Sequence, residues 1–244
     1  MHDRPRSATQ SRRPARRARR FAVAVLFLVM LGFPAAAQPT APADQPVLPR
    51  DLEIELALNA APKPLREAAT VLVLDAGGYV NARDGSNAFT CLVSRRGGDV
   101  FPVCWDAEGV NSLLPIDLDA AKARLAGRTN AEIEQTVAAG FKAGRYRAPS
   151  RTGIAYMLSP LRYRIDEQGH AVRANPNPHV MFYGPNLTDS DIGGARGSVV
   201  FMNKVGPDGM IIVPVGVTER ATIIEESQSL VDRFERHVGY TSAR

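Results

Sequence analysis

The sequence predicts an α+β fold with a mainly antiparallel sheet, a central helical segment and a C-terminal helix. Short runs of β-branched and aromatic residues fall into two groups, separated by a stretch whose apolar residues have helical spacing. A second helical pattern closes the chain. Because strands and helices do not alternate regularly, a parallel sheet with crossover helices is not predicted.

The N-terminal residues predict an export signal. A basic segment, Arg4–Arg20, precedes an apolar run at Phe21–Phe33, and Ala35–Ala37 supplies small residues for cleavage. The apolar run has about 13 residues, whereas ~20 helical residues are needed to cross a bilayer, so a cleavable signal peptide is favoured over a retained membrane span. We therefore expect residues 1–37 to be removed and the protein to be exported, to the periplasm or beyond.

The remaining chain divides into two parts. Residues 38–50 contain four prolines among small and polar residues and predict a flexible leader, while residues 51–244 predict a single domain. The whole sequence has 30 basic and 25 acidic side chains, but residues 1–37 hold eight arginines and one aspartate. Removing them leaves 22 basic and 24 acidic side chains, a net charge of −2, so nucleic acid is not an expected partner.

The first half of the domain predicts a helix followed by four strands. Asp51 is expected to cap a helix over Leu52–Ala60, although alternating apolar residues there also permit a strand. Glycine-containing turns separate the strands that follow, and we expect them to form a four-stranded meander. These strands are Thr70–Asp75, Tyr79–Arg83, Phe89–Ser94 and Val100–Trp105.

The last two of these strands predict a disulfide-bonded hairpin. Gly97-Gly98 suits a two-residue turn because both positions tolerate positive φ, and folding the chain there sets Cys91 opposite Cys104. In this register the cysteines form a non-hydrogen-bonded pair with Cα atoms about 4.5 Å apart. Pro102 also falls at a non-hydrogen-bonded position, so its missing N–H costs no hydrogen bond between the strands. An oxidising compartment favours the disulfide.

The tip of this hairpin carries Arg95 and Arg96. An Arg-Arg-Gly-Gly-Asp tip could bind an anion, but charged residues also protect exposed sheet edges. We expect both arginines to be solvated.

The centre and the C-terminal part predict helices on either side of a second meander. One or two short helices are expected over Ala107–Leu125, and Thr129 with Glu132 forms a capping box for a helix that ends near Gly144. The terminal helix is expected to place one apolar face on the core and to stop at Gly239. The apolar face of the terminal helix comprises Ile224, Val231, Phe234 and Val238. The strands of the second meander are Gly153–Leu158, His179–Tyr183, Val199–Asn203 and Met210–Val215.

The candidate site lies at the strand that begins at His179 and in the loop beyond it. Period two places His179 and Tyr183 on one face of the strand, and the loop adds Asn186, Asp189 and Asp191. Loops held by a sheet often carry function, so these five residues are the candidate binding residues. Each also has an ordinary structural explanation, because Asn and Asp are favoured in turns and Tyr packs well at the edge of a core.

The same residues permit a divalent metal. Oxygens of Asp189 and Asp191 could combine with His179 and His170 around the ion, which would support a metal-assisted hydrolase. His170 follows Glu167-Gln168-Gly169, a predicted hairpin turn, and could meet His179 if their strands pair. No H-E-x-x-H helix occurs, so no cofactor is indicated by a motif.

Two segments resemble an uncharacterised group of exported bacterial proteins. They read Gly-Ser-Asn-Ala-Phe-Thr-Cys-Leu-Val at residues 85–93 and Pro-His-Val-Met-Phe-Tyr at residues 178–183. The resemblance implies export and a shared domain over most of residues 52–215, without an activity or catalytic residues. We therefore expect an exported binding or envelope-associated protein whose partner is an unidentified ligand or envelope component, with the metal-assisted hydrolase as the alternative.

Overall fold

A computed structural model describes residues 47–165, 171–173, 177–194 and 198–238, which all lie in one compact unit of the chain, Pro39–Arg244. The helices are α1 (Arg50–Asn59), α2 (Lys63–Arg66), α3 (Ala107–Ser112), α4 (Leu114–Leu125), α5 (Asn130–Lys142) and α6 (Val217–Val238), with short 3₁₀ turns η1 (Arg96–Gly98) and η2 (Asp189–Ile192). The strands are β1 (Thr70–Asp75), β2 (Gly78–Arg83), β3 (Thr90–Ser94), β4 (Asp99–Trp105), β5 (Ile154–Met157), β6 (Tyr163–Ile165), β7 (Ala171–Arg173), β8 (His179–Tyr183), β9 (Phe201–Met202) and β10 (Met210–Pro214). The predicted signal peptide, residues 1–37, and most of the predicted leader lie outside the described residues.

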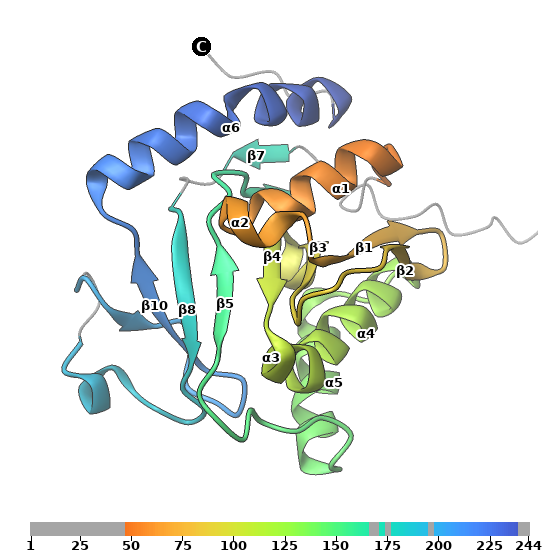
Figure 1. The fold of residues 1–244 in the computed structure, drawn as a ribbon. Helices are drawn as coiled ribbons and strands as arrows, with labels where there is room; N and C mark the ends of the chain where they lie inside the picture. Colours follow the sequence, from red (N-terminus) through yellow and green to blue (C-terminus); the bar gives the residue numbers. More distant parts are fainter. Residues whose placement is uncertain (1–46, 166–170, 174–176, 195–197, 239–244) are drawn as a thin grey trace, which may run out of the picture. The chain divides into compact units, whose positions relative to one another are not determined.

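The strands form one sheet with the order β2-β1-β3-β4-β5-β8-β10-β9, and β6 pairs with β4 and β7 beside it (Figure 1). Among the described residues, all strand pairs but one are antiparallel, which confirms the predicted α+β fold with its central and C-terminal helices. Within the ranges described, no helix is both long enough and apolar enough to cross a bilayer.

The hairpin of β3 and β4 has the predicted register. Cys91 lies opposite Cys104 and Val93 lies opposite Pro102. Cys91 and Cys104 form a disulfide with a Cα–Cα distance of 4.0 Å, close to the expected separation of a non-hydrogen-bonded pair. Gly97 and Gly98 both have positive φ, 71° and 80°, as the turn requires.

The prediction of a four-stranded meander was wrong, because β3 pairs in parallel with β1 instead of antiparallel with β2. The segment after β2 turns back across the start of β1, where Thr70 N donates to Phe89 O at 2.9 Å and Ser86 N donates to Ala68 O at 2.8 Å. A Cβ at Gly85 would overlap the backbone of Thr70, so this close crossing requires glycine.

The second meander is also rearranged. The chain passes from β8 through β9 to β10, but β10 lies between β8 and β9 in the sheet. The β6–β7 pair, which was not among the predicted strands, is antiparallel and brackets the turn predicted at residues 167–169. That turn itself lies outside the described residues.

The helices begin and end largely where the sequence indicates. The α5 capping box is present, with Glu132 N donating to Thr129 Oγ1 at 3.3 Å and Thr129 N donating to Glu132 Oε2 at 2.8 Å. Gly144 follows α5 with φ 73°. The predicted start of α1 was wrong by a residue or two, because Pro49 is its N-cap and Asp51 lies in its first turn.

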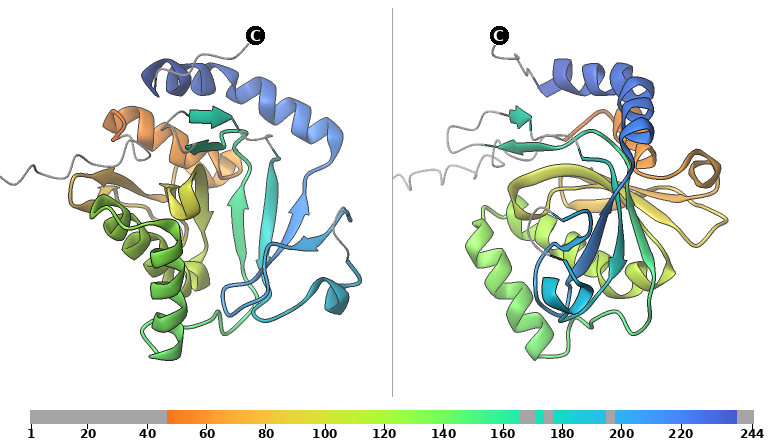
Figure 2. Two further views of the ribbon diagram at one scale, coloured as in Figure 1. Left: turned by 180° about the vertical axis from the view of Figure 1, so that it is seen from behind. Right: turned by 90° about the vertical axis from the view of Figure 1, so that its left-hand side faces the viewer.

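The helices cover the two faces of the sheet unequally (Figure 2). On one face α1 and α6 pack over a core around Leu56, Val71 and Cys104, to which α6 adds Val231 and Phe234 as predicted. On the other face α3, α4 and α5 pack over β3 and β4, and the part of this face formed by β5, β8 and β10 continues beyond these helices.

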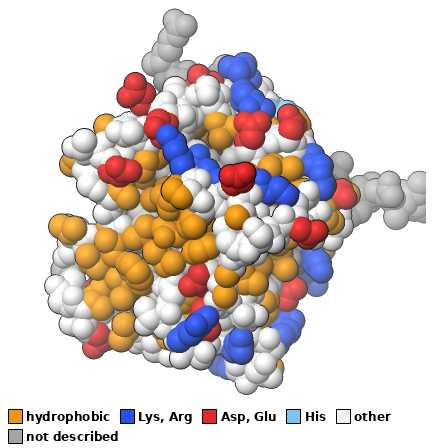
Figure 3. Space-filling view, viewed as in Figure 1, with side chains coloured by type: hydrophobic (Ala, Val, Ile, Leu, Met, Phe, Trp, Pro, Cys, Tyr) orange, Lys and Arg blue, Asp and Glu red, His pale blue; other side chains and the backbone are white. Residues whose placement is uncertain are grey.

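The first face is also incompletely covered. Hydrophobic side chains gather over β5, β8 and β10 in the space-filling view (Figure 3). Alternate residues of these strands, with half-buried side chains, point to this side: Ile154, Val180, Phe182, Ile211 and Val213. Their neighbours along each strand point to the opposite side, where the candidate site lies.

Candidate functional site

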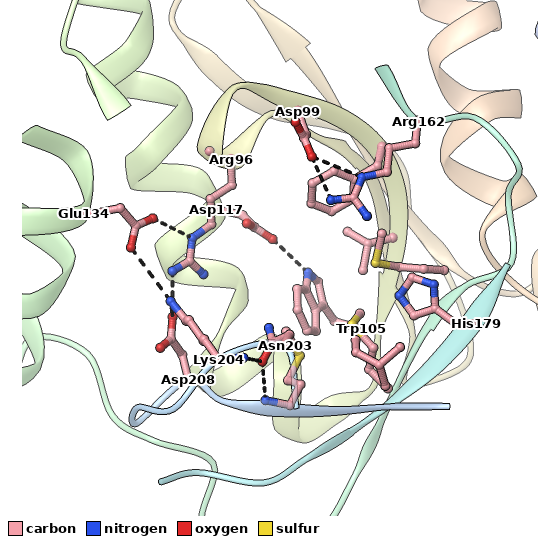
Figure 4. A pocket seen from close by; sticks show the side chains of 17 residues that line it. Arg96, Asp99, Trp105, Asp117, Glu134, Arg162, His179, Asn203, Lys204 and Asp208 are labelled. Atoms are coloured by element: carbon pink, nitrogen blue, oxygen red, sulfur yellow. Dashed lines mark hydrogen bonds and ion pairs between the residues drawn. The ribbon is translucent and has the colours of Figure 1, made fainter. Parts of the chain in front are cut away.

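A pocket of about 270 Å³ opens between the uncovered part of the second face, α4, α5 and the loop before β10. Its floor is apolar because strand period two directs alternate residues of four neighbouring strands to the same side. The floor residues are Phe101, Val103 and Trp105 from β4, Met157 from β5, Met181 from β8, and Met210 and Ile212 from β10. Figure 4 shows charged side chains at opposite ends of this floor.

One end of the pocket holds an ion-pair cluster, which we define as Arg96, Asp117, Glu134, Lys204 and Asp208. Asp208 Oδ2 lies 2.6 Å from Arg96 Nη2 and 2.7 Å from Lys204 Nζ. Glu134 is farther from the same cations, at 3.7 Å from Arg96 Nε and 3.8 Å from Lys204 Nζ. The side chain of Glu134 is 50% exposed, so its carboxylate is the one in the cluster that is held most weakly by the two cations.

Four separate elements bring this cluster together, and α4 and α5 supply Asp117 and Glu134. The β3–β4 tip carries Arg96 against α5, and a Cβ at Gly98 would lie 2.9 Å from Asn130 Nδ2. The loop between β9 and β10 supplies Lys204 and Asp208, and Asn203 Oδ1 holds this loop by accepting from Lys204 N and Met210 N at 2.7 and 2.8 Å. Burial opposes the charge on Arg96, but Asp117 and Asp208 outweigh it and raise its pKa.

Asp117 is the buried acid of the cluster. It accepts hydrogen bonds from Trp105 Nε1 at 3.0 Å and Ser94 Oγ at 3.3 Å. Burial raises the pKa of Asp117 to about 6, although Arg96, Trp105 and Ser94 act in the opposite direction. The carboxylate therefore ties the pocket floor to α4 and is ionised only above mildly acidic pH.

Replacement of Asp117 by asparagine tests this environment through the pH dependence of stability. The native carboxyl keeps its proton up to pH about 6, whereas an unfolded aspartate loses it near 3.8, so the free energy of unfolding falls as pH rises through this window. The asparagine side chain cannot ionise, so the stability of wild type relative to Asp117→Asn should fall by about 2 to 3 kcal/mol between pH 4 and pH 7. Urea unfolding at several pH values measures this difference, and parallel curves for the two proteins would contradict the raised pKa.

The other end of the pocket is formed by Asp99, Arg162 and His179, which we call the Arg162 end. Arg162 donates to Asp99 Oδ2 from Nε at 3.1 Å and from Nη2 at 2.7 Å, and its guanidinium carbon lies 6.0 Å from the centre of the Phe101 ring. Arg164 donates to Asp99 Oδ1 at 2.9 Å but does not line the pocket. One buried carboxylate is therefore shared by two arginines.

His179 is the sequence-predicted candidate that lies in the pocket. It is only 6% exposed, and its Nδ1 lies 2.5 Å from Asn177 O. Because a carbonyl oxygen only accepts, Nδ1 carries the proton and Nε2 is the acceptor of the neutral ring. Burial lowers the pKa of His179, a nearby positive charge on Arg162 adds to this effect, and the ring is neutral at pH 7.

The other predicted candidates serve the local structure. Tyr183 shares the face of His179 but its hydroxyl donates to Asp106 Oδ1 at 2.7 Å. Asn186 has φ 62° and occupies a turn, with its backbone N donating to Gly206 O at 2.7 Å. Asp189 Oδ1 accepts from Met202 N at 2.7 Å, and Asp191 Oδ2 accepts from Thr188 N at 2.8 Å.

The three proposed metal ligands that the structure describes, His179, Asp189 and Asp191, are not brought together. Among the described residues there is no group of three or more His, Cys, Asp or Glu side chains placed to hold a metal ion. His179 lines the pocket, whereas Asp189 and Asp191 stabilise the η2 turn and its contact with β9. His170 lies outside the described residues.

The expectation of a solvated hairpin tip was wrong. Arg95 is 2% exposed and pairs with buried Glu53, and the side chain of Arg96 is 16% exposed within the pocket. The two arginines are withdrawn from solvent because Arg95 pairs with Glu53 of α1, while the turn that carries Arg96 contacts α4 and α5. The alternation of Phe101, Val103 and Trp105 was visible in the sequence, but the loop and helices that complete the pocket are distant in sequence.

Comparison with protein-family models, with curated proteins and with solved structures finds no match to this chain.

Proposed function

We propose that this is an exported binding protein that holds a small ligand with an apolar body in the pocket over Trp105. The observation that carries the proposal is an apolar floor bounded at both ends by a few convergent polar groups. This is the usual construction of a small-molecule site, in which apolar contact gives affinity and the polar groups orient the ligand.

The floor is suited to adapt to its ligand. Three of the six methionines in the sequence, Met157, Met181 and Met210, line it together with Trp105 and Phe101. Methionine side chains are flexible and polarisable, and their sulfur atoms make favourable contacts with aromatic rings. These properties support binding of an aromatic or branched aliphatic group.

Export is supported by the chemistry of the cysteines and by the predicted signal peptide. Disulfides form and persist mainly in oxidising compartments, and Cys91 and Cys104 are both buried and bonded. The proposal therefore locates binding in the periplasm or outside the cell, where a small molecule or an envelope component is the partner.

Trp105 provides a direct test, because it is the one tryptophan in the sequence and lies in the pocket floor. Titration with the neutral fluorescent probe N-phenyl-1-naphthylamine should quench Trp105 emission and raise probe emission with the same saturation curve. Met157→Glu places a charge on the floor and should weaken binding by about tenfold or more, since the pocket then contains an unpaired carboxylate.

Val180→Glu is the matched control. Val180 is on the neighbouring strand, is half-buried like Met157, and faces the opposite side of the sheet. The Val180→Glu variant should bind the probe with an affinity within about twofold of wild type. Equal weakening by both variants, or probe emission that rises without quenching of Trp105, would contradict binding in the pocket.

A further inference from the structure

The distribution of charge along the pocket carries an inference about the class of ligand. We propose that the ligand is dipolar, with a cationic group at the ion-pair cluster, an anionic group at the Arg162 end, and an apolar body over Trp105. This inference rests on the proposed function, since it assigns a ligand class to the same pocket.

The ion-pair cluster has an excess of negative charge. Arg96 and Lys204 supply two positive charges, whereas Asp117, Glu134 and Asp208 supply three negative charges once Asp117 is ionised. Asp208 already contacts both cations, at 2.6 and 2.7 Å, so the excess negative charge of the cluster belongs to Asp117 and Glu134. Glu134, which is half-exposed and more than 3.5 Å from either cation, is placed to accept from a ligand ammonium group.

The Arg162 end has the opposite excess. Asp99 is contacted by Arg162 and by Arg164, so two positive charges share one carboxylate. Arg162 uses Nε and Nη2 on Asp99, which leaves the Nη1 group out of these bonds. The Nη1 group of Arg162 is a charged donor that suits a ligand carboxylate, whereas neutral His179 presents an acceptor at Nε2 and adds no donor to that contact.

The two ends are separated by the apolar floor, with Trp105 between them (Figure 4). A ligand that carried both charges on one atom or on neighbouring atoms could engage only one end. The arrangement therefore favours a ring or chain with an ammonium group at one end and a carboxylate at the other. Charge complementarity of this kind selects among ligands of equal size.

Four probes with the same aromatic body test the assignment. They are 4-(aminomethyl)benzoate with both charges, 4-methylbenzylamine with the cation, 4-methylbenzoate with the anion, and 4-methylbenzyl alcohol with neither. Isothermal titration calorimetry should show that the doubly charged probe binds about tenfold or more tightly than each of the others.

Two variants at the Arg162 end separate a direct contact from a general charge effect. Arg162→Gln and Arg164→Gln each remove one positive charge and one partner of Asp99, but only Arg162 lines the pocket. Arg162→Gln should reduce the affinity of 4-(aminomethyl)benzoate to that of 4-methylbenzylamine, and Arg164→Gln should reduce it by less than about threefold. Equal losses would overturn the proposed contact.

Glu134→Gln tests the other end. It should abolish the advantage of the doubly charged probe over 4-methylbenzoate, whereas Glu225→Gln, at an exposed position of α6, should preserve it. Similar binding of all four probes, or binding of none, would overturn the dipolar assignment. If N-phenyl-1-naphthylamine still binds over Trp105 in that case the pocket function survives, and if it does not, both proposals fail.

Discussion

Replacement of Arg95 by methionine should lower the free energy of unfolding by about 3 to 5 kcal/mol, because it leaves the Glu53 carboxylate buried without its cation. Arg95 Nη1 lies 2.8 Å from Glu53 Oε1, and the two side chains are 1% and 0% exposed. Glu53 Oε1 also accepts from Leu74 N at 2.9 Å. Urea unfolding of wild type and variant at pH 7 measures the loss.

The double variant Glu53→Gln/Arg95→Met is the informative control. Glutamine can still accept from Leu74 N but carries no charge, so the double variant should be more stable than Arg95→Met alone. A double variant that is as unstable as the sum of the single changes would show that packing of Arg95, and not charge compensation, explains the loss. The Glu53–Arg95 ion pair joins α1 to the hairpin tip that also carries Arg96. The ion pair therefore helps to hold Arg96 in its position in the pocket.

Removal of the disulfide should lower the free energy of unfolding by about 3 kcal/mol. Cys91 and Cys104 are fully buried and 13 residues apart, and the cross-link restricts the unfolded chain over that loop. The variant Cys91→Ala/Cys104→Ala should melt at a lower temperature than oxidised wild type. Its melting temperature should be unaffected by dithiothreitol, whereas that of wild type should fall once the bond is reduced; equal melting of the two oxidised proteins would contradict a stabilising role.

The features predicted from the sequence are those decided by neighbouring residues. The register of β3 and β4 follows from the Gly97-Gly98 turn, and the start of α5 follows from Thr129 and Glu132. The buried face of α6 follows from helical spacing, as Val231 and Phe234 show. In each case the determining residues lie within a few turns or one hairpin of one another.

The features that the sequence did not predict depend on distant segments. β3 can pair in parallel with β1 because the chain crosses the start of β1 at Gly85. In the sheet, β10 and not β9 lies beside β8, although β9 follows β8 in the chain. Burial of Arg95 and Arg96 depends on Glu53, 42 residues from Arg95, and on Asp208, 112 residues from Arg96. The residues of the hairpin tip alone therefore do not predict that both arginines pair with acids from distant parts of the sequence.

The candidate site shows the same division. Strand period two places His179 and Met181 on the same face of the strand, and both side chains line the pocket. Asn186, Asp189 and Asp191 were selected because they follow that strand, but their residue types equally suit the turn that they form. Two of the acids that line the pocket, Asp117 and Asp208, come from a helix and a loop on either side of that segment.

The measurement that tests ligand binding in the pocket most directly is the Trp105 indole N–H resonance in a ¹H–¹⁵N correlation spectrum during titration with 4-(aminomethyl)benzoate. The sequence contains one tryptophan, so one such resonance is expected, and its N–H donates to Asp117 in the pocket. This resonance should show a saturable displacement in wild type and Val180→Glu, and a much weaker one in Met157→Glu. Saturable changes confined to other residues, with the indole resonance unmoved, would contradict binding over Trp105.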